Sequence, residues 1–532
     1  MNFTATYLSY EETGSFSKTI IDYIAGNEKL ATFSAHPVTI KGIKDAISAR
    51  KDFPTQRKLL VENLQDKYAA IDTHERQKTN IDLLLNENTF TITTAHQPNI
   101  FTGPLYFIYK IVHVIRIADE LNKSMPDNQF VPVFYMGSED ADLDELGHIN
   151  VEGEKLEWKT DQKGAVGRMK VDKALIQLID KLSGQLLIHP SGPEIIKLMR
   201  ESYKEGVSIE AATFKIVNQL FSEYGLLVLL PDNPGLKRVF VPVMEKELLE
   251  GFSHKAVEAT LATFPAGYKA QAGGRELNLF YLDENKRERI EEQKDKWEVI
   301  NTELKFSKEQ LLAELNEHPE RFSPNVILRP VFQETILPNI VFIGGGGEIA
   351  YWLELRKVFE EARVPFPVMV MRNSFMIISK KEKKLLKKLG LSPQDLFKEE
   401  ILLLNELVKR DSKLKLDVEK EKQELQKVYA AIKLAATAID NSLAKHTETL
   451  EAKALKRIEA LEKKMLKSER KRFEAQQRQL HTLRSKLFPA NILQERMDNL
   501  LIYYSMWGKE FIHTIYQHSR KLEQDFCILE EN

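Results

Sequence analysis

Short apolar segments that alternate with helical patterns constrain the fold of this chain most strongly. Apolar runs typical of β-strands occur at residues 89–94 and 130–136, and residues 104–121 between them have the apolar spacing of a helix. Two further runs, at 226–230 and 339–343, are each followed by a turn and a predicted helix. Parallel strands require crossover connections of this kind. The pattern therefore predicts an α/β fold with a Rossmann-like parallel sheet core.

The length of the chain predicts more than one domain. With 532 residues it exceeds the size at which a single hydrophobic core stops growing. Segments of about 147–225 and 265–335 do not fit the strand and helix alternation, and we interpret them as folded connecting insertions in a core domain of residues 1–380. From 381 to 532 the chain is rich in Lys, Glu and Leu, which predicts an α-helical coiled-coil domain.

An apolar stripe with heptad-like spacing supports the coiled coil. Its first part consists of Leu414, Val418, Leu425, Val428, Ile432, Ala435 and Ile439. A second part, from Leu450 to Leu487, has an irregular step between Met465 and Phe473, which predicts a local stutter. The polar residues 440–442 fit either the turn of an antiparallel hairpin or one continuous helix. We expect this segment to pair two copies of the chain into a homodimer.

Charge and cysteine content exclude several classes of function. The 76 basic and 78 acidic residues nearly cancel, so the net charge gives no reason to expect a nucleic-acid partner. No segment approaches the roughly 20 apolar residues of a membrane span, and the first residues lack the pattern of a signal peptide, so we expect a cytoplasmic protein with no membrane contact. The single cysteine, Cys527, excludes intramolecular disulfides, and we interpret it as an inert thiol on a helical tail.

Residues 95–110 follow the first predicted strand and lead into a helix. A helix N-terminus after a strand presents free N–H groups to a phosphate or carboxylate. We therefore predict that His96, Gln97, Asn99, Thr102 and Gly103 bind substrate, the polar side chains by hydrogen bonds and the glycine by close approach. The alternative is an ordinary turn with a hydrogen-bonded, buried histidine.

An acidic segment, residues 138–148, follows the second predicted strand. We predict that Glu139, Asp140 and Asp142 are catalytic, with a general base that deprotonates an attacking ammonium group, and that Ser138 binds substrate. Such a cluster can also bind a divalent metal, although the sequence does not identify one. The alternative is an acidic first turn of a helix, which suits Asp144 and Glu145 equally well.

A glycine-rich turn joins the strand at 339–343 to a helix. Gly345 and Gly346 are predicted to let the backbone approach a ligand, with Glu348 and Tyr351 on the first turns of the helix beside them. The turn lacks the lysine that ends a P-loop, so it is no nucleotide-binding motif of that type.

Two arginines next to apolar segments are predicted to bind an anion. Arg329 and Arg372 lie where a guanidinium group usually needs an anionic partner, and Asn373 follows directly. We predict that these residues hold a carboxylate or phosphate of the substrate.

The motifs, in their order along the chain, resemble those of the bacillithiol biosynthesis cysteine-adding enzyme family. The resemblance covers nearly the whole chain and rests on AHQPNIFTGPLYFIYK, VPVFYMGSEDADLDELGH, FIGGGGEIAYWLEL, PVMVMRNS and, after the coiled coil, LFPANILQERMDNLL. The family implies a Rossmann-like core similar to that of class I aminoacyl-tRNA synthetases. It also implies a coiled coil that pairs two subunits.

The resemblance implies a ligase reaction. The enzyme would join the carboxyl group of cysteine to the amine of glucosaminyl malate, the last step of bacillithiol biosynthesis. Forming an amide from a free carboxylate requires activation, which either ATP, together with Mg²⁺, or an already activated form of cysteine would supply. The residues alone also allow another synthetase-like or nucleotidyl-transfer enzyme, or a non-catalytic coiled-coil scaffold with a degenerate nucleotide fold.

Overall fold

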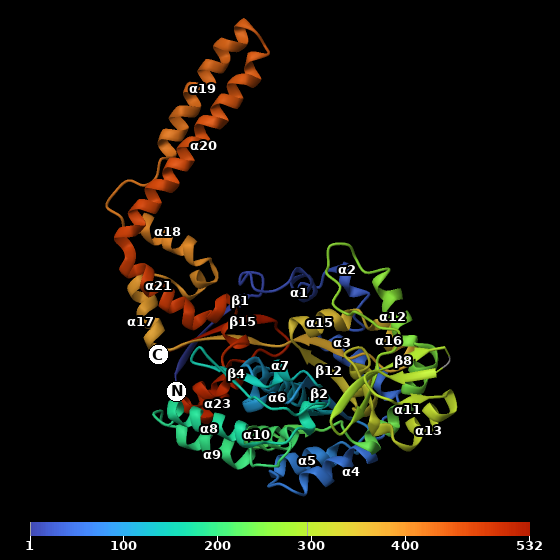
Figure 1. The fold of residues 1–532 in the computed structure, drawn as a ribbon. Coiled ribbons are helices and arrows are strands. Elements are labelled where there is room, and N and C mark those ends of the chain that lie inside the picture. The colour runs from blue at the N-terminus through green and yellow to red at the C-terminus, as the bar shows by residue number, and fades with distance from the viewer. Residues whose placement is uncertain (1, 295) are drawn as a thin grey trace. The chain divides into compact units, whose positions relative to one another are not determined.

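The computed structural model describes residues 2–294 and 296–532 and divides into two compact units. Unit 1 extends to Met376 and also includes Leu493–Leu529, whereas unit 2 comprises Ile377–Ile492 and Glu530–Asn532 (Figure 1). The expected helical domain of residues 381–532 is therefore divided between the units. The physical reason is that the aromatic helices after residue 493 bury their apolar faces in unit 1.

A five-stranded parallel sheet forms the core of unit 1. Its strand order is β13 (Val368–Met371), β12 (Asn339–Gly344), β2 (Thr89–His96), β3 (Gln129–Met136) and β6 (Leu227–Leu229). Each neighbouring pair is parallel, and every residue of β2, β12 and β13 is buried. The Rossmann-like parallel sheet predicted from the apolar runs is confirmed.

The strand order reverses beside β2. From β2 the chain proceeds to β3 and β6 on one side, and it later returns to place β12 and β13 on the other side. In open parallel sheets such a reversal leaves a crevice at the carboxyl ends of the two strands involved. The crevice between the ends of β2 and β12 is therefore the expected place for a ligand.

Helix α6 (Tyr106–Ser124) makes the crossover from β2 to β3 and packs against both strands. Its apolar residues recur every three or four positions, so that one broad face is buried. On the other side of the reversal, β12 leads into α15 (Gly346–Leu353), and α16 (Arg356–Ala362) precedes β13. The strands are thus connected as the alternating sequence pattern predicts.

Two segments interrupt this alternation. The segment between β3 and β6 contains α7 (Leu143–Leu146), the hairpin of β4 (His148–Val151) and β5 (Glu154–Glu157), and the helices α8 (Lys173–Leu186), α9 (Gly192–Ser202) and α10 (Ile209–Phe221). After β6 come α11 (Pro234–Glu250), α12 (Phe252–Leu261) and an antiparallel sheet in the order β10 (Lys305–Phe306), β9 (Lys296–Val299), β8 (Lys286–Gln293), β7 (Leu279–Asp283) and β11 (Phe322–Pro324). α13 (Lys308–Glu317) and α14 (Arg329–Ile336) complete this second segment.

The two ends of unit 1 pack onto the core. Five helices precede β2, namely α1 (Lys18–Ile24), α2 (Glu28–Ala31), α3 (Ile40–Lys51), α4 (Arg57–Tyr68) and α5 (Glu75–Leu83). Near the other end, α22 (Leu500–Trp507) packs against α9, and α23 (Lys509–His518) packs against α6. A three-stranded sheet joins β1 (Phe3–Ser9), β15 (Asp525–Glu531) and β14 (Ser374–Ile378).

Cys527 lies on strand β15, so the prediction that it sits on a helical tail is wrong. Its side chain is buried, and burial raises the pKa of the thiol to about 12. The thiol is therefore protonated at neutral pH and is a poor nucleophile.

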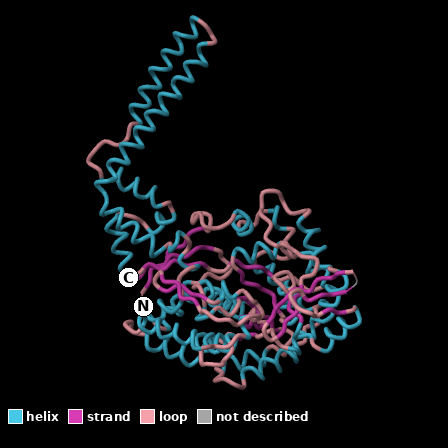
Figure 2. The backbone as a smooth tube through the Cα atoms, in the orientation of Figure 1, coloured by secondary structure: helices cyan, strands magenta, loops and turns pink. Residues whose placement is uncertain are grey.

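Unit 2 is helical and contains α17 (Lys380–Leu389), α18 (Glu400–Asp411), α19 (Glu419–Ile439), α20 (Leu443–Arg470) and α21 (Glu474–Leu487) (Figure 2). Helices α19 and α20 form an antiparallel hairpin, since Lys422 pairs with Glu462 at 2.8 Å and Lys433 with Glu448 at 2.5 Å. A 3₁₀ turn follows α20 at the irregular step of the apolar stripe. Within the described residues, no helix combines the length and the apolar character needed to cross a membrane.

Candidate active site

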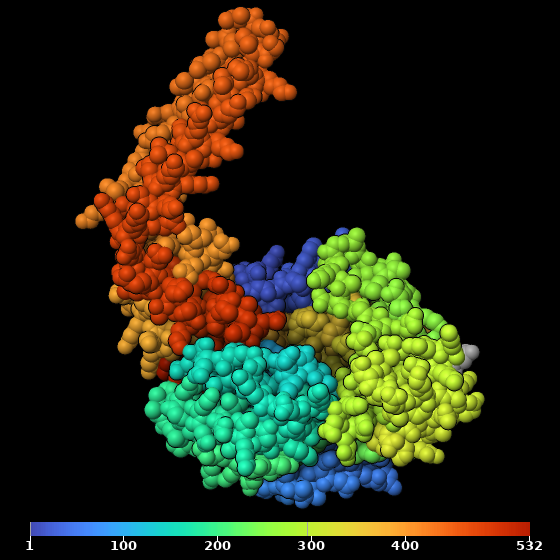
Figure 3. Space-filling model, viewed as in Figure 1, coloured from blue at the N-terminus to red at the C-terminus, as the bar shows by residue number. Residues whose placement is uncertain are grey.

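A cavity of about 570 Å³ opens at the carboxyl ends of β2, β3 and β12, at the predicted crevice. Residues of the antiparallel sheet, including Leu279, Arg287 and Pro324, line it from another side. Figure 3 shows the surface hollowed between the teal segment after β3 and the yellow-green segment that contains this sheet. The cavity therefore joins the strand ends of the core to the second insertion.

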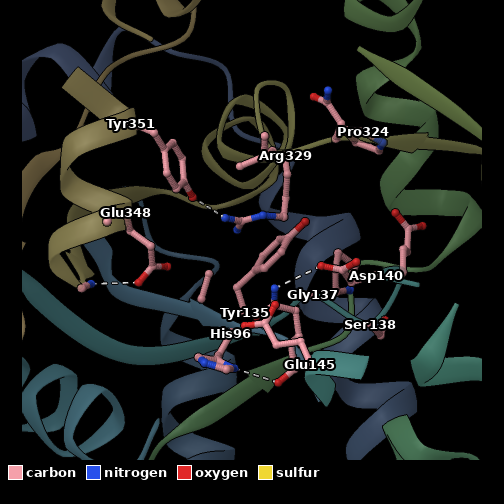
Figure 4. A pocket seen from close by; sticks show the side chains of 18 of the residues that line it. His96, Tyr135, Gly137, Ser138, Asp140, Glu145, Pro324, Arg329, Glu348 and Tyr351 are labelled. Atoms are coloured by element: carbon pink, nitrogen blue, oxygen red, sulfur yellow. Dashed lines mark hydrogen bonds between the residues drawn. The ribbon is translucent and has the colours of Figure 1, made fainter. Parts of the chain in front are cut away.

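His96 ends β2 and lines the cavity together with Gln97 (Figure 4). Its Nδ1 lies 3.0 Å from the carbonyl oxygen of Gln97, which can only accept, so Nδ1 carries the proton and Nε2 keeps its lone pair. Burial, followed by the charge of Lys110, lowers the pKa of His96 to about 4. The imidazole is thus neutral at physiological pH, and its Nε2 can accept a hydrogen bond.

The other predicted residues of this turn do not line the cavity. Asn99 and Thr102 are buried, and Gly103 has a φ of 60°. A Cβ atom at position 103 would lie 2.7 Å from the Cβ of Asn99, and the amide of Asn499 donates hydrogen bonds to the carbonyls of Phe101 and Gly103. Gly103 is therefore required by the tight turn itself.

The end of β3 supplies an acidic wall. Ser138, Glu139 and Asp140 line the cavity, and the side-chain amide of Gln97 donates to Asp140 Oδ2 at 3.1 Å. The Asp140 carboxylate is only partly buried and faces the cavity beside Tyr135 in Figure 4. This side-chain hydrogen bond thus adds to the backbone contact between Gly137 and His96 in connecting the carboxyl ends of β2 and β3.

Asp142 is not part of this wall. Its side chain is exposed and caps α7 by accepting the N–H of Glu145 at 3.0 Å. Glu145 itself borders the cavity, and burial, together with Asp142 and Asp140, raises the pKa of its carboxyl group. Of the three acids predicted to be catalytic, Glu139 and Asp140 therefore line the cavity, whereas Asp142 caps α7.

Glu139 is held by the protein on both carboxylate oxygens. Its Oε1 forms an ion pair with Lys237 of α11, and its Oε2 accepts a hydrogen bond from Ser323 Oγ at 2.9 Å. Burial raises the pKa of Glu139, and this outweighs the opposing effect of Lys237. Each oxygen of this carboxylate already has a partner in the protein, which makes Glu139 less suited than Asp140 to accept a substrate proton.

The glycine turn after β12 forms the opposite wall. Gly345 and Gly346 line the cavity with negative φ angles, so their role is close approach and not a left-handed backbone. Glu348 accepts the N–H of Gly345 at 2.8 Å and forms an ion pair with Lys110. Lys110 also donates to the carbonyl of Ala95 at 2.9 Å. This pair therefore connects the ends of β2 and β12 across the crevice.

The pKa values of Lys110 and Glu348 both lie below their ordinary values, but for different reasons. Burial lowers the pKa of Lys110 despite the neighbouring Glu348. Burial alone would raise the pKa of Glu348, but Lys110 and the N–H of Gly345 lower it below its ordinary value.

Arg329 lies at the start of α14, and its guanidinium group donates to the hydroxyl of Tyr351 at 2.8 Å. Figure 4 shows this contact above the ring of Tyr135. Across residues 2–294 and 296–532, no carboxylate forms an ion pair with Arg329. The group is half-buried and lines the cavity, so an anionic ligand would provide its missing partner.

Arg372 differs from Arg329, although it also borders the cavity. It is 2% exposed and forms two hydrogen bonds with the buried carboxylate of Glu495, at 2.6 and 3.0 Å. Asn373 is buried and does not line the cavity. The predicted anion of Arg372 is therefore an internal carboxylate.

Several cavity residues were missed by sequence reasoning, namely Tyr106, Lys110, Tyr135, Arg275, Arg287 and Arg496. Two of these residues could have been found from the sequence. Tyr135 is near the end of β3, and Lys110 is one helical turn beyond Tyr106. Arg287 could not, because it lies in an insertion far from the strand ends in sequence.

Two models of protein domains from one family match this chain. Residues 3–373 match the family model described as "Bacillithiol biosynthesis BshC, N-terminal Rossmann-like domain", and residues 375–531 match "Bacillithiol biosynthesis BshC, C-terminal coiled-coil domain". This chain belongs to the bacillithiol biosynthesis BshC family. The resemblance inferred from the ordered motifs is thereby confirmed.

Curated members of the BshC family align over almost the full chain. Two proteins named "Putative cysteine ligase BshC", from Flavobacterium johnsoniae and Flavobacterium psychrophilum, are 38% and 39% identical to it. The alignments cover 98% of this chain and 99% and 98% of those proteins. A protein of the same name from Christiangramia forsetii is 36% identical, again with 98% of both chains covered.

Proposed function

We propose that this protein joins the carboxyl group of cysteine to the amine of glucosaminyl malate in the last step of bacillithiol biosynthesis. The support is membership of the BshC family together with one feature of the site. An acidic group, Asp140, and a guanidinium group without an internal carboxylate partner, Arg329, line the same cavity. In the proposed reaction the acidic group accepts the proton of the substrate ammonium group. The guanidinium group binds a carboxylate of the substrate.

Each cavity wall has a chemical role in this proposal. Asp140 accepts the proton of the substrate ammonium group, so that the free amine can attack, and Gln97 holds the carboxylate in place. His96 Nε2 accepts a hydrogen bond from a substrate hydroxyl or amine, because its imidazole stays neutral. Arg329 and Tyr351 bind a substrate carboxylate. These groups bring amine and carboxyl carbon together, which lowers the entropic cost of the reaction.

ATP is the proposed source of activation of the cysteine carboxyl group. The N–H of Gly345 is taken by Glu348, but Gly346 and Gly347 line the cavity at the N-terminus of α15, where the first backbone N–H groups of a helix have no partner within the helix and can bind a phosphate. Within the described residues, no group of three or more His, Cys, Asp or Glu side chains could hold a metal ion. We propose that Mg²⁺ arrives with the phosphates of ATP. The reaction is proposed to occur in the cytoplasm.

Mass spectrometry tests the proposal directly. The full-length protein is incubated with glucosaminyl malate, cysteine, ATP and Mg²⁺, and each component is omitted in turn. We expect the amide product only in the complete mixture, and D140A should abolish most of it. The matched control is D144N, because Asp144 is an exposed acid of the same segment that does not line the cavity. Full turnover by D140A would contradict the assignment of the base.

We also propose that α19 and α20 pair with a second copy of the chain. None of the described residues of α19 is buried, and its apolar positions Val428 and Ile432 are 55% and 47% exposed. A second hairpin would cover them. Deleting everything after residue 400 would also remove residues 493–529 of unit 1, so point variants give the cleaner test. Sedimentation should show a dimer for the wild type and a monomer for V428E/I432E, and a monomeric wild type would refute the dimer.

A further inference from the structure

A second guanidinium group, that of Arg287, lines the cavity without a carboxylate partner in the described chain. It projects from β8 of the antiparallel sheet and is half-buried. Its carbon lies 4.1 Å from the centroid of the Phe280 ring, and its Nη2 lies 3.4 Å from the carbonyl of Pro324. The aromatic ring fixes the plane of the group without neutralising its charge.

A chain of side-chain contacts sets the direction of Arg287. Its Nε donates to Ser323 Oγ at 3.1 Å, and this hydroxyl donates in turn to Glu139 Oε2 at 2.9 Å. The other carboxylate oxygen of Glu139 is paired with Lys237, which is 1% exposed on its side chain and also donates to the carbonyl of Phe322 at 2.9 Å. The hydroxyl of Ser323 can bridge the two groups only in this orientation, because it has one proton to donate.

This chain explains why Glu139 stands at the end of β3. Ser323 lies on β11, so the contacts connect the core sheet with the antiparallel sheet of the second insertion. Nε of Arg287 is used for this connection and Nη2 donates to the carbonyl of Pro324, so among the described residues Nη1 has no hydrogen-bond partner. A charge-assisted hydrogen bond to a ligand carboxylate would satisfy it.

Arg287 and Arg329 together match a ligand with two carboxylates. They belong to different elements, β8 and α14, and both line the same cavity without an internal carboxylate. The malyl group of the proposed acceptor is a dicarboxylate. Arg287 has hydrogen-bond partners in Ser323 and Pro324 but no carboxylate at ion-pair distance among the described residues, so a second anionic group on the ligand would be its direct charge partner.

We infer that Arg287 is a specificity-determining residue that, with Arg329, binds the two carboxylates of the malyl group, and that Ser323 and Glu139 position it. The inference rests on the proposed function and deepens it. It also gives Glu139 a role that does not require a free carboxylate oxygen.

Calorimetric titration of the full-length protein with glucosaminyl malate tests the binding role. R287M should raise the Kd about 10- to 100-fold, as expected for the loss of a charged hydrogen bond, and R287K should lie between R287M and the wild type. The control is K286M, since Lys286 is the exposed neighbour on β8 that does not line the cavity, and its Kd should match that of the wild type.

Steady-state kinetics with a second acceptor tests the specificity. Glucosaminyl lactate has a methyl group in place of the carboxymethyl group of malate and therefore lacks one carboxylate, so the wild type should strongly prefer glucosaminyl malate in kcat/KM. In R287M this preference should collapse toward unity. S323A should raise the KM for glucosaminyl malate several-fold with kcat and the KM for cysteine unchanged, and S323T should restore it.

The results distinguish a failure of the role assigned to Arg287 from a failure of the proposed function. If the wild type makes the amide but R287M binds glucosaminyl malate as tightly as the wild type and keeps the preference over the lactate analogue, Arg287 has no such role. If the wild type neither binds glucosaminyl malate nor makes the amide, the proposed function fails and the inference falls with it.

Discussion

Arg329 and Arg372 were predicted to bind an anion for the same reason, yet the structure gives them opposite roles. Arg372 is almost fully buried and is neutralised by Glu495 within the protein. Arg329 lines the cavity, and the side-chain hydrogen bond that its guanidinium group makes within the described residues goes to the hydroxyl of Tyr351. An arginine beside an apolar strand thus indicates that an anion is needed. Only its surroundings show whether the protein or a ligand supplies that anion.

The largest expected effect follows from breaking the internal pair. R372M leaves the carboxylate of Glu495 buried without its partner, which should lower the free energy of unfolding by about 3–5 kcal/mol. Urea denaturation of the full-length protein measures this. R329M should change stability by less than about 0.5 kcal/mol, because its group has no buried carboxylate to leave unpaired. Equal losses in the two variants would remove the distinction between them.

Two buried histidines should make the free energy of unfolding depend on pH. The pKa values of both His96 and His113 are about 4, below the ordinary value of 6.5, with burial as the largest cause. The unfolded chain then binds more protons than the folded protein between pH 6.5 and 4. The free energy of unfolding should therefore fall as the pH is lowered through this window, on the order of 3 kcal/mol for each histidine.

Denaturation curves between pH 7 and 4 check this expectation, and H96Q and H113Q should each reduce the slope. Both ring nitrogens of His113 have partners inside the protein, the carbonyl of Lys521 and the N–H of Asn373, whereas in His96 Nδ1 alone has a hydrogen-bond partner among the described residues. Activity near neutral pH should therefore drop further in H96Q than in H113Q. An unchanged slope in both variants would refute the depressed pKa values.

Removing the cavity arginine should affect binding more than folding. R329M should raise the KM for glucosaminyl malate about 10- to 100-fold, because a charged hydrogen bond to a carboxylate is lost. R329K should recover part of the lost affinity, because lysine restores the positive charge but cannot form the planar, bidentate contact of a guanidinium group. Initial rates at varied substrate concentration provide the measurement, and an unchanged KM would show that the missing anion is not this substrate.

The smallest effect is expected for the acid that serves the fold. D142A removes the cap of α7 and should lower the free energy of unfolding by about 1 kcal/mol, whereas D142N keeps an acceptor and should be nearly neutral. Both variants should retain turnover, in contrast to D140A. A loss of turnover in D142N with normal stability would return Asp142 to the catalytic group.

The fold was more predictable from the sequence than the site. Runs of apolar and β-branched residues predicted β2, β3, β6 and β12 with every end within two residues, because a strand buried on both faces consists mainly of such residues. The polar residues directly after these strands gave His96, Gln97, Asp140 and Glu348. Asn99 and Thr102 looked equivalent to them, but the tight turn buries both away from the cavity.

By itself the sequence determined the parallel sheet, the polar strand ends, the helical segment after residue 380 and the family, since these depend on local periodicity and ordered motifs. Tertiary structure alone decided which charges are satisfied internally. Glu495 reaches Arg372 across 123 positions of the chain, and Ser323 connects Arg287 with Glu139 across insertions that no local pattern relates. Periodicity reports which residues are buried, whereas the partner of a buried charge depends on how distant elements pack.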